Sequence, residues 1–191
     1  MRKKDYSFHT GLSQRLWISF KNLETDSNLE SYVKYYKALS TWAIANKDSI
    51  GDRIFDEFRL SILIKLDPQK YVREDMESSG ISLEMEHKRM FGREKPKYLE
   101  TLAQRIGTTL WDLVTEYSGI DCPCCIYDDG LRYVMIEKDS NKCELALCCE
   151  SCGRLQALNG RIIPSEGLKI KPANREDIEK YSALIPPTVP K

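Results

Sequence analysis

The chain has 191 residues, with 29 lysines and arginines against 29 aspartates and glutamates, so its formal net charge is zero. Residues 1–121 contain 19 basic and 19 acidic residues, and residues 122–191 contain 10 of each. Proteins that bind nucleic acid usually carry a positive surplus, because phosphate contacts dominate their affinity. The composition therefore disfavours a nucleic-acid partner and fits a protein partner.

The sequence also disfavours contact with a membrane. Its basic start is followed by mixed polar and apolar residues, unlike a secretory signal. The longest apolar run, residues 60–66, contains Ser61 and Lys65, and it is far shorter than the roughly 20 apolar residues that span a bilayer. We expect a cytoplasmic protein.

The first half of the chain predicts helices. Apolar residues at helical spacing predict one helix over residues 12–24. Ser27 and Glu30 have the spacing of a capping box, which predicts the start of a second helix that ends near residues 46–48. A third, largely apolar segment predicts one buried helix over residues 50–66. Aromatic residues crowd these helices, and any exposed ones among them, with Tyr35 and Trp42 nearest the flanks of the apolar stripe, would suit a protein interface.

Asp67 and Pro68 match an N-cap followed by proline at the first helical position, so they predict a short helix that ends before Gly80. Residues 81–95, which include Glu84 and His87, fit a short helix and a loop.

From Pro96 the helical pattern is strong. Apolar residues repeat at helical spacing over six turns as far as Tyr117, and Gly119 occupies a C-cap position. Within this stretch, residues 102–113 also resemble a helix-turn-helix. Asp112 and Glu116 in the would-be recognition helix have the wrong charge for phosphates, and the uninterrupted apolar stripe favours one long helix.

All seven cysteines fall between Cys122 and Cys152, which indicates a domain boundary just before them. We expect a helical domain over residues 1–118 and a cysteine-containing β module over residues 119–163. A short strand and helix should follow over residues 164–184, then a disordered tail over residues 185–191, which contains three prolines.

The module has the pattern of a β-hairpin between two cysteine pairs. Residues 131–137 and 143–148 predict two strands, and residues 153–163 can supply a third. Further on, residues 168–170 predict a short extended piece, and Asn174 begins the capped start of a last helix.

The cysteine pairs have the spacing of metal ligands. A first knuckle, residues 122–125, contributes Cys122 and Cys125, and a second knuckle, residues 149–152, contributes Cys149 and Cys152. Four thiolates fill a tetrahedral zinc and leave no position for substrate, so the pattern predicts a structural Zn²⁺. In a reducing compartment such thiols are metal ligands more often than disulfides.

The order of knuckle, hairpin, knuckle and strand resembles a zinc ribbon over residues 120–163, and this resemblance implies the same four ligands. Cys124, Cys143 and Cys148 are surplus. Spacing alone allows Cys124 to replace either cysteine of the first knuckle, and Cys148 to replace Cys149. The simpler interpretation of the surplus cysteines is that they are small buried apolar residues.

The predicted fold class is α+β and mainly α. Since His9 and His87 are the only histidines, and the sequence has no phosphate-binding loop, we predict a non-enzymatic protein without catalytic residues. The Cys-Pro-Cys-Cys element resembles small bacterial proteins encoded beside toxins, including immunity proteins that neutralise a toxin. This resemblance implies a stoichiometric protein partner, with a toxin as the candidate; the oligomeric state and the binding surface stay open.

Two other functions remain as alternatives. A nucleic-acid-binding regulator would use the ribbon or residues 102–113, and it would need a basic patch on the folded surface. The residues that could form that patch are Arg154, Arg161, Lys169 and Lys171. An enzyme with a structural zinc would use His87 beside Glu84 in a cleft.

Overall fold

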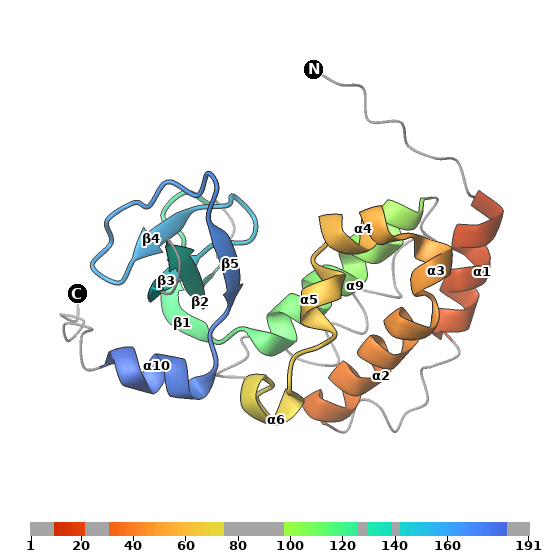
Figure 1. The fold of residues 1–191 in the computed structure, drawn as a ribbon, viewed down its shortest axis with the longest axis horizontal. Coiled ribbons are helices and arrows are strands. Elements are labelled where there is room, and N and C mark those ends of the chain that lie inside the picture. Colours follow the sequence, from red (N-terminus) through yellow and green to blue (C-terminus); the bar gives the residue numbers. More distant parts are fainter. Residues whose placement is uncertain (1–9, 22–30, 75–97, 126–129, 139–141, 183–191) are drawn as a thin grey trace, which may run out of the picture. The chain divides into compact units, whose positions relative to one another are not determined.

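A computed structural model of the chain describes residues 10–21, 31–74, 98–125, 130–138 and 142–182. Helices occupy the N-terminal part and one antiparallel sheet occupies the C-terminal part, followed by a last helix (Figure 1). The predicted α+β class is therefore confirmed. The described residues form two compact units. The first contains the helices up to residue 68 and residues 98–113, and the second contains residues 69–74 and 114–182.

Within the described residues, the first unit is built from three longer helices and three short ones. The longer helices are α1 (Thr10–Lys21), α2 (Tyr32–Ala45) and α9 (Leu99–Val114), and the short ones are α3 (Lys47–Ile50), α4 (Asp52–Glu57) and α5 (Leu60–Leu63). Helix α6 (Pro68–Tyr71) lies where the two units meet in sequence.

Aromatic side chains join α1 to α2. The rings of Phe20 and Trp42 lie 5.0 Å apart in an edge-on arrangement, and the Trp42 indole donates a hydrogen bond to Ser19. Tyr35 and Trp42 were candidates for an exposed interface, but they are only 4% and 3% exposed. Both side chains therefore belong to the core.

The helix starts follow local capping chemistry. Ser31 caps α2, because its hydroxyl accepts a hydrogen bond from the Lys34 amide. The predicted capping box at Ser27 and Glu30 lies outside the described residues. Pro68 begins α6 as predicted.

The prediction of one helix over residues 50–66 was wrong. The backbone breaks at Gly51, where φ is 90°, and at Arg59, where φ is 58°, so the segment forms the end of α3 followed by α4 and α5. The Tyr36 hydroxyl donates to the Leu63 carbonyl at 2.6 Å and fixes the end of α5. After the second break the buried apolar residues are Leu60 and Leu63, whereas Ile62, which continues the helical spacing from Ile54 and Phe58, is 48% exposed.

Helix α9 runs through Gly107 without a break, so residues 102–113 do not form a helix-turn-helix. A Cβ atom on Gly107 would lie 2.7 Å from the Phe58 carbonyl oxygen, which shows how closely this helix approaches the turn between α4 and α5. The helix ends at Val114, before the predicted Tyr117. There the backbone turns into the sheet, where the Tyr133 amide donates to the Glu116 carbonyl at 2.9 Å.

The sheet of the second unit is centred on one strand. Its strands are β1 (Tyr117–Asp121), β2 (Gly130–Lys138), β3 (Lys142–Cys148), β4 (Leu155–Ala157) and β5 (Lys169–Pro172). The order is β1-β2-β3-β4, and β5 also pairs with β2. Strand β1 pairs with the start of β2, and β5 pairs with the end of β2. Strands β1 and β5 therefore lie along one edge of β2, and β3 lies along the other edge.

Two apolar clusters form around the sheet. One contains Leu131 and Leu147 with two cysteines. The other contains Met135 and Leu145 with Ile178 of α10 (Arg175–Ser182). Asn174 and Asp177 exchange side-chain to backbone hydrogen bonds, as the capped start of α10 predicts. The partly buried Tyr133 packs against both clusters.

Residues 69–74 are tied to the second unit by an ion pair between Arg73 and Glu116, both of which are mostly buried. Arg132 adds a hydrogen bond of 3.0 Å to the Thr115 carbonyl. Among the helices that the structure describes, none is long and apolar enough to cross a lipid bilayer.

Candidate metal centre

The two knuckles are turns at the ends of strands. The first begins where β1 ends, and the Cys125 amide donates to the Cys122 carbonyl at 3.3 Å. The second connects β3 to β4, and the Gly153 amide donates to the Cys149 carbonyl at 3.0 Å. Gly153 has a φ of 71°, which glycine adopts without strain. Because β2 and β3 pair along their length, the sheet brings the knuckles together.

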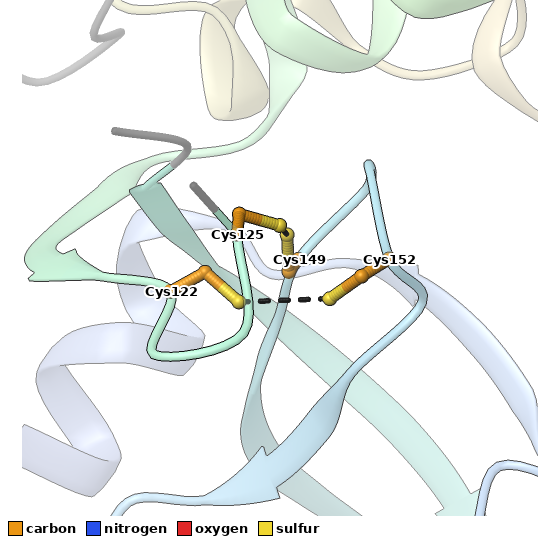
Figure 2. A group of neighbouring side chains, drawn as sticks. All are labelled: Cys122, Cys125, Cys149 and Cys152. Carbon is orange, nitrogen blue, oxygen red and sulfur yellow. Dashed lines mark hydrogen bonds between the residues drawn. The ribbon is translucent and has the colours of Figure 1, made fainter. Parts of the chain in front are cut away.

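The four predicted cysteines lie side by side (Figure 2). All four sulfurs are within 4.8 Å of one another, and the pairs Cys122–Cys152 and Cys125–Cys149 are each 3.5 Å apart. A tetrahedral zinc with Zn–S bonds of about 2.3 Å places its sulfurs about 3.8 Å apart, whereas a disulfide joins them at about 2.05 Å. The cluster is therefore compatible with a metal ion such as zinc, and all seven cysteines are free thiols.

Burial differs among the four thiols. Cys122 and Cys149 are buried against Leu131 and Leu147, Cys125 is half-buried, and Cys152 is exposed. One side of the centre is therefore fixed by the apolar core, and the other faces solvent.

Two of the clustered thiols, Cys125 and Cys149, resist ionisation. The hydrogen bond with the Cys149 thiol, followed by burial, raises the pKa of Cys125 far above its usual range. Burial raises the pKa of Cys149, whereas the backbone N–H of Arg154 lowers the pKa of Cys152. Several thiolates this close together repel one another, and a divalent cation removes that repulsion.

The surplus cysteines lie outside this group. The exposed Cys124 sulfur accepts a hydrogen bond of 3.2 Å from Arg154 instead. Cys148 is buried and contacts the Cys149 carbonyl, and Cys143 is half-buried beside the α10 cluster. The geometry thus favours Cys122 and Cys125 over Cys124, and Cys149 over Cys148. That the four grouped thiols bind a metal stays a prediction.

Arg154 contacts both knuckles, which the sequence analysis missed. Its backbone carbonyl accepts from the Cys149 amide at 2.9 Å, and its guanidinium donates to Cys124 at 3.2 Å and to Gln156 at 2.8 Å. The sequence offered only its position two residues after Cys152, which by itself does not reveal a contact with the first knuckle.

The four basic residues that would form a nucleic-acid patch are divided. Arg154 and Arg161 flank β4 at one edge of the sheet, whereas Lys169 and Lys171 lie in β5 at the other edge. Lys171 also forms an ion pair of 3.5 Å with Glu137. The described sheet therefore does not gather these charges at one edge.

His87 and Glu84, the pair considered for an enzymatic site, lie outside the described residues.

Comparison of the chain with protein-family models, with curated proteins and with solved structures found no match.

Proposed function

We propose that the second unit holds one structural Zn²⁺ ion, bound by Cys122, Cys125, Cys149 and Cys152. The observation that carries this proposal is the convergence of four sulfurs from two knuckles within 4.8 Å. The residues fit the ion, because four thiolates complete a tetrahedral zinc and two sulfur pairs at 3.5 Å approach the expected spacing.

A zinc with four protein ligands has no open position, so its role here is to link the end of β1 to the connection between β3 and β4. Such a link would fix the connection between β3 and β4, a strand of only three residues. Metal binding in a module of this size contributes directly to the free energy of folding.

We further propose that the protein acts by stoichiometric binding to another protein, and that this partner is a bacterial toxin which it neutralises. The balanced charge supports a protein partner over a nucleic acid. The toxin assignment rests on the resemblance of the Cys-Pro-Cys-Cys element. The half-exposed Ile18 and Ile44 of the first unit offer apolar side chains for such a contact.

Native mass spectrometry of the untagged protein, purified from its own host under reducing conditions, tests both proposals. We expect one zinc per chain and a second protein bound in a fixed ratio. The complex should re-form from the purified components, and the variant Ile44→Glu should weaken it if α2 contributes to the contact. A zinc-loaded chain that binds no protein under these conditions would contradict the partner proposal and leave the metal proposal standing.

A further inference from the structure

The two sulfur–sulfur contacts of 3.5 Å in the metal centre both join one knuckle to the other. Cys122 lies 3.5 Å from Cys152, and Cys125 lies 3.5 Å from Cys149. Together the two contacts use each of the four sulfurs once. Within the mutual cluster of four sulfurs, these two contacts define two pairs, and each pair has one member from each knuckle (Figure 2).

We propose that this centre is also a site of reversible oxidation, at which a hydroperoxide converts the four thiolates into the disulfides Cys122–Cys152 and Cys125–Cys149 and releases the zinc. The inference rests on the proposed metal centre and adds a chemical response to its structural role.

The burial pattern supports this reaction, because each pair combines an accessible sulfur with a buried one. Cys152 is exposed and its partner Cys122 is buried, while Cys125 is half-buried and its partner Cys149 is buried. A small oxidant can reach the outer sulfur of each pair from solvent. The inner sulfur then lies at contact distance for the second step, shielded from further oxidation.

The chemistry balances within each pair. The outer thiolate attacks the hydroperoxide, the O–O bond breaks, and the sulfur becomes a sulfenic acid while the peroxide leaves as an alcohol, or as water if it is hydrogen peroxide. The inner thiolate then attacks that sulfur, the S–S bond forms, and hydroxide leaves as water. Each pair loses two electrons to one hydroperoxide and takes up two protons from solvent. Zinc dissociates because it has lost its ligands.

The topology gives this pairing a structural consequence. The Cys125–Cys149 link closes a segment of 24 residues that lies inside the 30-residue segment closed by Cys122–Cys152. These nested links would hold the knuckles together after zinc has left, so the sheet would be retained. Disulfides within each knuckle would leave the two knuckles unconnected. Reduction by a dithiol, with zinc present, would restore the metal centre.

The tryptic cleavage sites make the pairing easy to test. Cleavage after Arg105 and Arg132 releases the first knuckle, and cleavage after Lys142 and Arg154 releases the second. Links between knuckles join these two peptides, whereas links within knuckles leave them separate. The full chain with Cys124→Ser and Cys143→Ser is the suitable background, because both substitutions remove accessible thiols from outside the four-sulfur group.

The zinc content of this reduced, full-length protein is measured first, and hydrogen peroxide is then added while a chromogenic chelator reports free zinc. We expect one zinc released per chain, a single disulfide-linked pair of peptides, retained β-sheet circular dichroism, and reversal by dithiothreitol with zinc. In the added variant Cys152→Ser, only Cys125 and Cys149 should be linked, and Cys122 should remain open to alkylation.

Separate peptides carrying internal disulfides, or zinc that stays bound while the cysteines stay reduced, would overturn the inference and leave the metal centre intact. A starting protein that is fully reduced and free of zinc would instead refute the metal centre, and the switch with it. The zinc measurement made before oxidation distinguishes the two failures.

Discussion

The sulfur of Cys122 lies 3.5 Å from that of Cys152, although 30 residues separate them in the chain. The antiparallel pairing of β2 with β3 produces this proximity, because it returns the chain to the place where it left the first knuckle. A sheet too small for a large core thereby presents a set of ligands whose geometry suits a tetrahedral metal ion.

Loss of one grouped thiol should abolish tight zinc binding. We expect Cys152→Ser to weaken zinc affinity by more than about 100-fold, because a neutral hydroxyl is a far poorer zinc ligand than a thiolate. Competition with a chromogenic chelator measures this change. Cys143→Ser is the matched control, since Cys143 lies outside the four-sulfur group, and it should retain affinity within about twofold. Equal losses in the two variants would contradict the ligand assignment.

Arg154 should support the metal centre without binding the metal. Arg154→Gln removes a positive charge and the hydrogen bond to Cys124, and we expect zinc affinity to fall by about 10-fold while one zinc per chain still binds at saturation. The exposed Arg161, just beyond β4, provides the control variant Arg161→Gln. If both substitutions lower the affinity equally, a general charge effect explains the result better than the contact.

The pH dependence of stability should differ in sign between the metal-free and zinc-loaded forms. The neighbouring thiol and burial raise the pKa of Cys125 above its ordinary value of 9.0, and burial raises the pKa of Cys149 likewise. The stability contributed by these protonated thiols is fully present below that value and is lost as the pH rises above it. The lowered pKa of Cys152 makes stability rise with pH instead, but Cys125 and Cys149 are two groups whose effect opposes that of this single group.

The zinc-loaded protein needs thiolates, so protons compete with the metal, and its stability should fall as the pH decreases. Urea unfolding of both forms between about pH 6 and about pH 10 measures the two slopes. Metal-free protein that becomes more stable as the pH rises above the ordinary thiol pKa would contradict the observed clustering of the sulfurs.

The close approach of α9 to the turn after α4 predicts the sign of a glycine substitution. Alanine normally stabilises a helix relative to glycine by about 1 kcal/mol. At Gly107 its Cβ would lie 2.7 Å from the Phe58 carbonyl oxygen, so we expect Gly107→Ala to lower the free energy of unfolding by about 1–2 kcal/mol.

Gly11 in α1 is the control for this substitution, since a Cβ atom there would meet no atom within 4 Å. Gly11→Ala should leave stability unchanged or raise it by about 0.5 kcal/mol. Chemical denaturation measures the free energy of unfolding of both variants. A Gly107→Ala variant that is more stable than the original protein would show that α9 does not pack this closely against Phe58.

The cysteine spacing predicted which residues could form the metal centre, but it could not choose among adjacent cysteines. Cys124 and Cys125 are neighbours in sequence, and only the folded turn shows that Cys125 faces the second knuckle while Cys124 faces Arg154. The α+β class and the hairpin followed from periodicity and turn residues, because those signals are local.

The breaks in the helices were harder to predict. Gly51 is a visible helix breaker, but Arg59 adopts a left-handed conformation that its residue type does not favour. Its guanidinium lies 5.0 Å from the centre of the Trp111 ring on α9. A contact between residues this far apart in sequence leaves no trace in local periodicity, so the end of α4 could not be predicted from the segment itself.

The zinc content of the purified, reduced protein tests the central claim most directly. Native mass spectrometry should show one zinc ion per chain, and removal of the ion by a strong chelator should lower the free energy of unfolding of the second unit. A chain that carries no metal, keeps seven free thiols and retains its β-sheet signal would contradict the proposed metal centre.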